Sequence, residues 1–274
     1  MLKAIFDFYI MSSFHVALAA FSLSYITLLK FGLPFDEDIL FFIFFASVTG
    51  YNFVKFFGLA KFHHRSLTTR LRVIRVFSFF SFLCMAYFFV GLKIEPIMVI
   101  AIFALITFLY AVPILPKRLF MDESQRLRSI SGLKIYLIAL VWSGVTVILP
   151  LVNADNFYGE GVLLLIIQIF LFVLAVMLPF EIRDLNYDSL KLATIPQKIG
   201  ITRTKILGLI LLIAVFILEM LNPISDFKSI VVTGIIAAVC AILIIFSRKN
   251  QNAYYTSFFV EGLPTLWLVL ILVF

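Results

Sequence analysis

The chain has 274 residues, of which 63% are hydrophobic and 14% charged, and its mean hydropathy is +1.13. A soluble domain of this length could not bury so much apolar surface, because ordinary globular proteins are about 45–50% apolar and about 25% charged. The net charge of +7 comes from basic residues in short connections between apolar segments, so it does not indicate a nucleic-acid-binding domain. The composition predicts an all-α, polytopic membrane protein that has the lipid bilayer as a partner and no nucleic acid.

Nine apolar segments of about twenty residues can be drawn along the chain, and each is long enough to cross a bilayer as a helix. They cover approximately 8–31, 37–60, 72–92, 96–116, 129–150, 161–183, 205–222, 228–247 and 255–273. The first segment shows no small-residue cleavage motif, so we expect a membrane span rather than a cleavable signal peptide. We therefore expect a single domain over residues 1–274, with about nine helices bundled around a central apolar cavity that opens to the cytoplasmic side.

The connections between these segments alternate in charge. Those after the first and fifth segments are acidic, with Asp36, Glu37, Asp38, Asp155 and Glu160. Those after the second, fourth, sixth and eighth are basic, with Lys61, Arg65, Arg70, Arg72, Arg75, Lys117, Arg118, Arg126, Arg128, Arg183, Lys191, Lys198, Arg203, Lys205, Arg248 and Lys249. Because basic connections stay in the cytoplasm, we predict a cytoplasmic amino terminus, an external carboxyl terminus and a bacterial-type inner (plasma) membrane.

Three acids lie at the end of the sixth segment. If the helix continues through them, Glu181, Asp184 and Asp188 share one face, at positions i, i+3 and i+7. The helix dipole disfavours negative charge at a carboxyl terminus, so a hard divalent cation such as Mg²⁺ is a natural partner for these acids. The alternative is a solvated helix end whose acids are neutralised by Arg183 and nearby lysines.

The residues around these acids resemble motifs of the UbiA superfamily of intramembrane prenyltransferases. Arg183, Asp184 and Asp188 are followed by the stretch 194–200 (TIPQKIG), which is similar to the second aspartate-rich motif of that family. The fourth segment ends near Tyr110, and Lys117 and Arg118 follow, which resembles the family's Tyr…Lys-Arg element. The number of spans and the order of the motif loops also match, so the resemblance covers essentially the whole chain.

This resemblance implies the transfer of a prenyl group from a prenyl diphosphate to a lipophilic, often aromatic, acceptor. Mg²⁺ would bridge the diphosphate to the aspartates and neutralise the charge that builds on the leaving group. Asp184 and Asp188 would be catalytic metal ligands, joined at the metal by Glu181. The candidate substrate-binding residues are Asn52, Lys55, Lys61, Tyr110, Lys117, Arg118, Arg183 and Lys198.

The first aspartate-rich motif of the family is degenerate in this chain. Asn52 matches that motif, but Phe53, Phe56 and Ala60 occupy its three aspartate positions. Phenylalanine and alanine cannot bind a metal, so half of the expected Mg²⁺ cage is absent. Basic residues that include Lys55 and Lys61 stand nearby, and they could hold a diphosphate through charge-assisted hydrogen bonds; alternatively, Lys55 simply extends from its helix end towards the membrane interface.

Three functions therefore stay open. The first is a divergent prenyltransferase. The second is a catalytically impaired protein with the same fold, which binds a polyprenyl or anionic lipid or serves as a membrane subunit of a larger assembly. The third is a small transporter, which the sequence favours least because no inverted pair of broken spans is apparent.

One further acid stands inside the last apolar segment. If that helix begins near Tyr255, Glu261 lies about 9 Å below its start, at 1.5 Å per residue. Ionisable residues at such depth face the interior of the helix bundle and are functional candidates. We therefore expect Glu261 to face the bundle interior, protonated or paired.

Overall fold

In a computed structural model of the chain, residues 2–59, 69–112, 132–186 and 193–274 are described. Within these ranges the regular secondary structure is entirely helical, which confirms the all-α prediction. The helices are α1 (Leu2–Met11), α2 (Phe14–Lys30), α3 (Glu37–Leu59), α4 (Thr69–Val90), α5 (Ile94–Ala111), α6 (Lys134–Ser143), η3 (Gly144–Ile148), α7 (Leu149–Asn153), α8 (Val162–Asp184), α9 (Ile195–Ile199), α10 (Ile201–Leu221), α11 (Phe227–Phe246), η5 (Tyr255–Val260) and α12 (Leu263–Val273), where η marks a π-helix.

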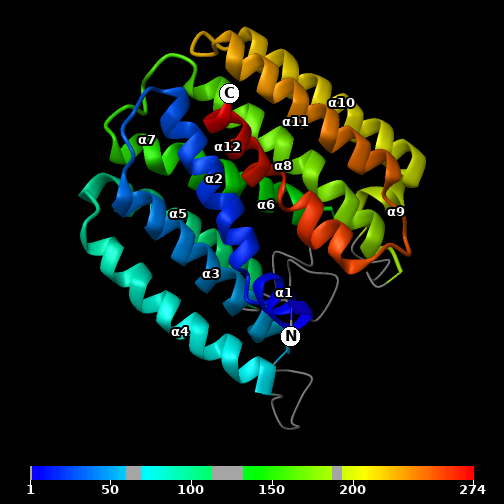
Figure 1. Cartoon of the computed structure of the whole chain (residues 1–274), viewed down its shortest axis with the longest axis horizontal. Helices are drawn as coiled ribbons and strands as arrows, with labels where there is room; N and C mark the ends of the chain where they lie inside the picture. Colours follow the sequence, from blue (N-terminus) through cyan, green and yellow to red (C-terminus); the bar gives the residue numbers. More distant parts are fainter. Residues whose placement is uncertain (1, 60–68, 113–131, 187–192) are drawn as a thin grey trace, which may run out of the picture.

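The number of membrane spans agrees with the sequence prediction. Eight helical segments of the described residues are long and apolar enough to cross a bilayer, and a bent pair, α1 with α2, raises the number to as many as nine. The chain is thus a polytopic integral membrane protein. Its two ends lie at opposite ends of the bundle (Figure 1), whereas the side of the membrane that each end faces stays a prediction.

The first span differs from the expected continuous helix over 8–31. The helix breaks at Ser12 and Ser13, and α1 is bent by 58° from α2. Ser13 has a left-handed backbone conformation with φ of 65°. Serine side chains compete with the helix for backbone hydrogen bonds, and the Ser12 hydroxyl donates to the Tyr9 carbonyl oxygen at 3.4 Å.

Helix α8 lies at the centre of the larger hydrophobic core. It packs against α6, α10 and α11, and α2 and α12 complete the same cluster (Figure 1). A second cluster joins α2 to α3 and α7. Helices α4 and α5 are peripheral, because only 11% of each span is buried, compared with 61% of α8.

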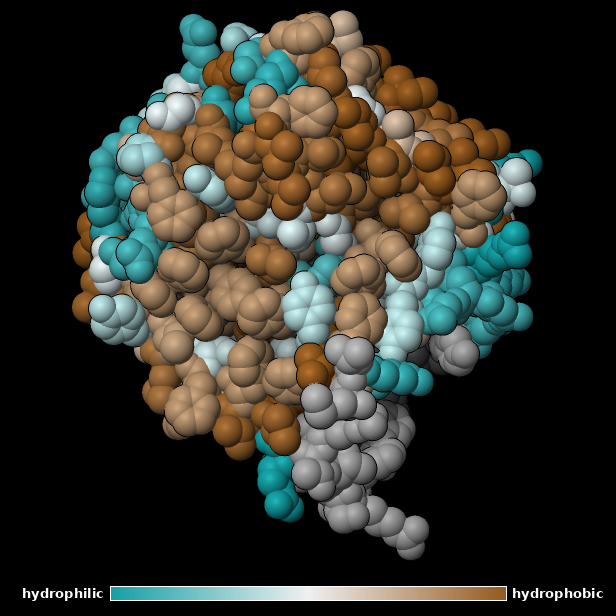
Figure 2. Space-filling view, viewed as in Figure 1, coloured by the Kyte–Doolittle hydropathy of each residue, from teal (hydrophilic) through white to brown (hydrophobic). Residues whose placement is uncertain are grey.

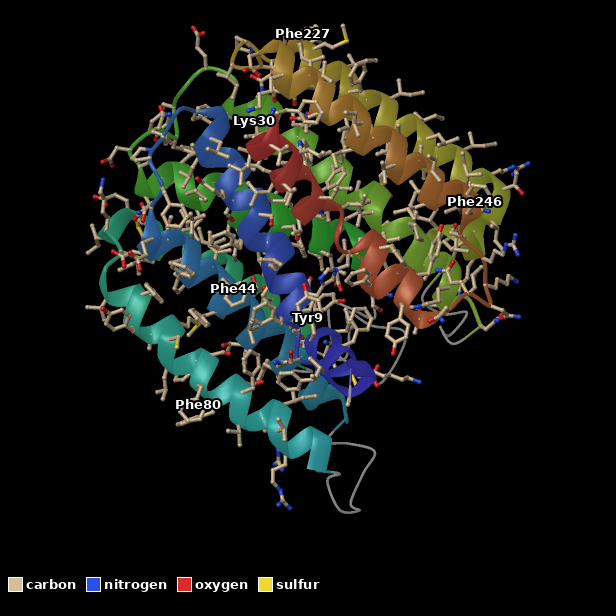
Figure 3. The ribbon with its side chains drawn as sticks, viewed as in Figure 1. Tyr9, Lys30, Phe44, Phe80, Phe227 and Phe246 are labelled. Carbon is tan, nitrogen blue, oxygen red and sulfur yellow. The ribbon has the colours of Figure 1, made fainter. Side chains whose placement is uncertain are left out.

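The outer surface is strongly apolar. Figure 2 shows hydrophobic side chains over most of one face, with hydrophilic ones gathered near its edges. Phe80, Phe227 and Phe246 point outward from the periphery of the bundle (Figure 3) and are 59%, 82% and 60% exposed. Lipid is the solvent for a surface of this kind, so large exposed apolar side chains are favourable there.

Candidate functional site

An apolar cavity of about 170 Å³ lies inside the bundle, between α3, α6, α8 and the break in the last span. Its wall is largely aromatic and aliphatic, and it carries one carboxylic acid and one phenol among the described residues. The lining residues are Tyr51, Ile138, Trp142, Phe172, Val173, Val176, Met177, Phe180, Glu261 and Pro264.

Glu261 reaches this cavity because the last span is not a continuous α-helix. The span begins as the π-helix η5, in which the Glu261 N–H donates to the Thr256 carbonyl oxygen at 3.0 Å, five residues back. A turn at Glu261 and Gly262 follows, and Pro264 lies in the first turn of α12. Short π-helical segments are frequent at functional sites, and the expectation that Glu261 faces the bundle interior agrees with its position in the cavity wall.

Two side chains from other helices hold the π-helix in place. The His15 Nε2 atom lies 2.9 Å from the Phe258 carbonyl oxygen, and the Tyr9 hydroxyl lies 2.7 Å from His15 Nδ1. Gly262 permits this approach, because a Cβ at that position would lie 3.1 Å from His15 Nε2 and 2.6 Å from the Phe258 carbonyl oxygen. The position of Glu261 is therefore fixed by contacts with α2 as well as by its own helix.

Arg183 connects the cavity wall to the end of α8. Its Nε atom donates to Asp184 at 2.7 Å, and its terminal nitrogen donates to the Thr256 hydroxyl at 2.6 Å. Its guanidinium carbon lies 5.3 Å from the ring centroid of Phe180, a residue that lines the cavity. Arg183 also interacts electrostatically with Glu261, as does Lys55. A fixed cation thus stands between the apolar cavity and the acidic helix end.

The acids at the end of α8 have different surroundings. Helix α8 ends at Asp184, so the expected continuation through Asp188 is not observed, and Asp188 lies outside the described residues. Glu181 is 2% exposed and accepts a hydrogen bond from the Ile195 backbone N–H at 3.1 Å, which ties the start of α9 to α8. Asp184 has a quarter of its side chain exposed and is paired with Arg183.

No group of three potential metal-binding acids, cysteines or histidines occurs among the residues that the structure describes. Two of the three predicted ligands are described. Glu181 is buried, whereas the Asp184 carboxylate is partly open to solvent. Mg²⁺ is commonly held by one or two protein carboxylates plus substrate phosphates. Among the described residues, Asp184 is therefore a single carboxylate that could join an ion arriving with a diphosphate. The metal-ligand roles of Asp184, Asp188 and Glu181 stay predictions.

Asn52 and Lys55 belong to a polar cluster at the break between α1 and α2. The Asn52 amide nitrogen donates to the Ser12 carbonyl and to the Ser78 hydroxyl, both at 2.8 Å, and its oxygen accepts from the Ser13 hydroxyl at 2.9 Å. Lys55 donates to the same Ser13 hydroxyl at 2.7 Å. Asn52 is 1% exposed, so its amide stabilises the helix break, and its role in substrate binding stays a prediction.

Two of the remaining predicted substrate-binding residues, Tyr110 and Lys198, are described by the structure. Tyr110 lies in the last turn of α5 and interacts electrostatically with Tyr51, which lines the cavity. Lys198 is exposed on α9. Lys61, Lys117 and Arg118 lie outside the described residues, as does Ala60 of the degenerate motif.

The sequence prediction missed the aromatic pair in the cavity wall. The Trp142 Nε1 atom donates to the Tyr51 hydroxyl at 2.8 Å, and this contact joins α6 to α3. A tryptophan inside an apolar span needs a partner for its N–H, which was the available signal. The identity of that partner depends on packing between residues that are far apart in the sequence.

A second buried polar cluster lies at the opposite end of the bundle. Lys30 forms an ion pair with Glu219 at 2.5 Å, and their side chains are 3% and 0% exposed. Glu219 also accepts hydrogen bonds from Gln168, Ser225 and Ser229 at 2.6 to 2.7 Å. Figure 3 shows Lys30 near the α10–α11 pair and far from Tyr9. This cluster joins α2, α8, α10 and α11.

Comparison with known proteins identifies the fold. No family model and no curated protein sequence matches the chain. A UbiA homologue from Aeropyrum pernix K1 is structurally similar, with a TM-score of 0.67 and 15% identity, over 94% of this chain and 97% of that one. A digeranylgeranylglyceryl phosphate synthase is also similar, with a TM-score of 0.59 and 15% identity, over 99% of this chain and 98% of that one. The predicted resemblance to the UbiA superfamily is confirmed as a resemblance of fold.

Proposed function

We propose that the chain, as one domain over residues 1–274, is an intramembrane prenyltransferase that transfers a prenyl group from a prenyl diphosphate to a lipophilic acceptor. The main support is the match of nearly the whole chain to two structures of this fold, one of them described as a synthase. The position of Arg183, between an acidic helix end and an apolar cavity, supports the same function. A prenyl diphosphate has an anionic end and an apolar chain, and these two features are complementary to that arrangement.

In this proposal Arg183 binds the diphosphate, and Asp184 and Asp188 hold the Mg²⁺ that enters with it. The ion neutralises negative charge on the leaving diphosphate when bound. Arg183 is suited to phosphate because its planar guanidinium presents several donors in a fixed geometry. The cavity wall excludes water from the allylic end of the prenyl group, so that the acceptor rather than water captures it.

The second candidate is a protein of the same fold that binds a polyprenyl or anionic lipid without transferring it. Two observations favour it. Phe53 replaces an aspartate of the first motif and is 43% exposed, and the Asn52 amide is occupied by hydrogen bonds within the protein. A site with one acidic motif binds fewer ions, and its capacity to ionise a diphosphate is reduced accordingly.

Pyrophosphate release separates the two candidates. Purified protein in detergent is incubated with Mg²⁺, radiolabelled geranyl diphosphate and a membrane lipid extract that supplies acceptors, with and without a chelator. Transfer chemistry predicts release that the chelator abolishes and that Asp184→Asn lowers by about a hundredfold or more, as for loss of a group that stabilises transition-state charge. Asp155→Asn is the matched control, because Asp155 is an exposed acid that pairs with Lys93 at the other end of the bundle. Binding of the diphosphate without release, unaffected by the chelator, supports the second candidate.

A further inference from the structure

Two cations from different helices meet at one end of the α10–α11 pair. Lys205 lies in the second turn of α10, and its Nζ atom donates to the Ile245 carbonyl oxygen at 2.6 Å, near the end of α11. Arg248 follows the end of α11 and lies close enough to Lys205 for the two charges to repel each other. The hydrogen bond to α11 therefore holds Lys205 beside a second cation.

Neither cation has an acidic partner among the residues that the structure describes. The described acids at the end of α8 have partners of their own, because Glu181 accepts a backbone N–H and Asp184 pairs with Arg183. Two like charges that are held close together at a protein surface raise its free energy. An anion that binds between them offsets that cost.

The surface that continues from these cations along both helices is apolar. On α10, Ile206 and Ile210 are 52% and 56% exposed, and on α11, Ile242 and Phe246 are 54% and 60% exposed. Figure 2 shows hydrophilic side chains beside hydrophobic ones at its right-hand edge, where this end of α10 and α11 lies in Figure 1. A phospholipid has an anionic head and apolar chains, and both are complementary to this surface. A soluble anion would use the cations alone.

The two ends of α11 differ in charge. Phe227 and Phe246 are exposed residues at its opposite ends (Figure 3). Beside Phe227 stand one acid and one base, Asp226 and Lys228, whose charges balance. Attraction of an anionic lipid is therefore expected at the Phe246 end and not at the Phe227 end.

We propose that Lys205 and Arg248 bind the headgroup of an anionic phospholipid, such as phosphatidylglycerol, whose acyl chains lie along the apolar surface of α10 and α11. The ammonium of Lys205 has three donors, and the Ile245 carbonyl occupies one of them. The remaining donors and the Arg248 guanidinium form charge-assisted hydrogen bonds with phosphate oxygens. This binding is independent of the proposed prenyl transfer.

Brominated phospholipids test the site, because they quench a tryptophan that they contact. Phe246→Trp places a reporter beside the cations, and Phe227→Trp places one at the other end of the same helix. Each variant is reconstituted in mixtures of phosphatidylglycerol and phosphatidylcholine in which one of the two is brominated, and the signal of Trp142 and Trp267 from the unsubstituted protein is subtracted. Each basic residue near a bilayer surface strengthens the binding of anionic lipid about fivefold, so Phe246→Trp should report a preference for phosphatidylglycerol of about ten- to thirtyfold. Phe227→Trp should report about threefold or less.

Charge variants in the Phe246→Trp background show whether the two cations are responsible. Lys205→Gln/Arg248→Gln should reduce the preference to about threefold or less. Arg248→Gln alone changes an exposed side chain, so it decides the result if the double variant does not fold, and it should reduce the preference about fivefold. Arg72→Gln is the matched control, because it removes an exposed cation from α4 and should leave the preference unchanged.

Three results would overturn the proposal. The first is an equal preference at the two reporters. The second is a preference that survives Arg248→Gln or that falls equally with Arg72→Gln, since diffuse surface charge would then explain it. The third is displacement of phosphatidylglycerol by millimolar inorganic phosphate at constant ionic strength, which would assign the cations to a soluble anion instead of a lipid.

Discussion

The buried ion pair between Lys30 and Glu219 should make a large and measurable contribution to folding. Their side chains are 3% and 0% exposed, and Nζ lies 2.5 Å from Oε1. Lys30→Met leaves a buried carboxylate whose remaining partners are the neutral donors of Gln168, Ser225 and Ser229. Removing one partner of a buried pair typically costs about 3–5 kcal/mol, and we expect Lys30→Met to lower the free energy of unfolding by that amount.

The double variant Lys30→Met/Glu219→Gln distinguishes charge burial from lost packing. Glutamine keeps the shape of Glu219 and removes the uncompensated charge; its amide oxygen can still accept from Ser225 and Ser229, whereas the acceptor for Gln168 is lost. We therefore expect the double variant to be more stable than Lys30→Met alone by about 2 kcal/mol or more, a coupling within the range measured for residues in one network. Unfolding by SDS in mixed micelles, followed by circular dichroism, gives the four free energies of the cycle.

The exposed pair between Lys93 and Asp155 is the matched comparison. Their side chains are 48% and 69% exposed, and exposed pairs contribute little because water and salt screen them. Lys93→Met should leave the unfolding curve unchanged. The reasoning is refuted if Lys30→Met behaves like Lys93→Met, or if Glu219→Gln does not restore stability in the Lys30→Met background.

Three further predictions concern other parts of the chain. Arg183→Lys should lower pyrophosphate release from geranyl diphosphate by about tenfold or more, because lysine cannot reproduce a planar guanidinium at a site of this kind; kinetics with saturating Mg²⁺ measure it. Gly161→Ala should destabilise the protein by about 1–2 kcal/mol in the same SDS assay, because Gly161 has φ of 80° and a Cβ there would lie 2.2 Å from Asn222 Oδ1. The hydrogen bond from Tyr254 to Asp7 raises the pKa of Tyr254 above 10.0, so the attachment of α1 by this bond should persist at neutral pH and be lost as the pH rises through the raised value; absorbance at 295 nm follows the titration.

Each of these predictions has a control. Arg248→Lys changes an exposed arginine in another basic connection and should leave pyrophosphate release unaffected. Gly50→Ala places a Cβ where no atom lies within 4 Å, so it should be neutral or slightly stabilising. Tyr254→Phe removes one phenol from the titration, and the difference spectrum isolates Tyr254. A Tyr254 midpoint at or below the ordinary value contradicts the proposed attachment of α1.

The sequence was sufficient to predict the general architecture, because a bilayer is crossed by apolar helical segments of about twenty residues and these can be recognised in a sequence. Apolar segments of bilayer length predicted the spans, and the described helices agree with them apart from the ends and the breaks in the first and last spans. The first of these breaks lies at Ser12 and Ser13, and the Ser13 hydroxyl is bonded there to Asn52 and Lys55, which are far from it in the sequence. A hydropathy profile contains no such information.

The candidate site was predictable only in part. Glu261 could be singled out because an ionisable residue deep in an apolar segment usually faces the bundle interior. The structure places it in the cavity wall. The contact of Tyr51 with Trp142 and that of Lys30 with Glu219 each join helices that are far apart in the sequence, so no local pattern indicates them. Glu181 shows the opposite case: its spacing from Asp184 suggested a shared ligand role, yet its carboxylate also has the Ile195 N–H as a structural partner.

The π-helix in the last span has a consequence for comparing this chain with other proteins. A π-helical turn accommodates one residue more than an α-helical turn of the same height, and one residue corresponds to a rotation of about 100° around a regular helix. Removing a single residue from Tyr255–Val260 would rotate Glu261 by about 100° relative to the preceding turn and so away from its place in the cavity wall. Where a homologue has an ordinary α-helix at this place, the residue that superposes on Glu261 is therefore shifted by one position in the sequence. A sequence alignment without a gap would pair Glu261 with a residue that occupies a different place in the structure.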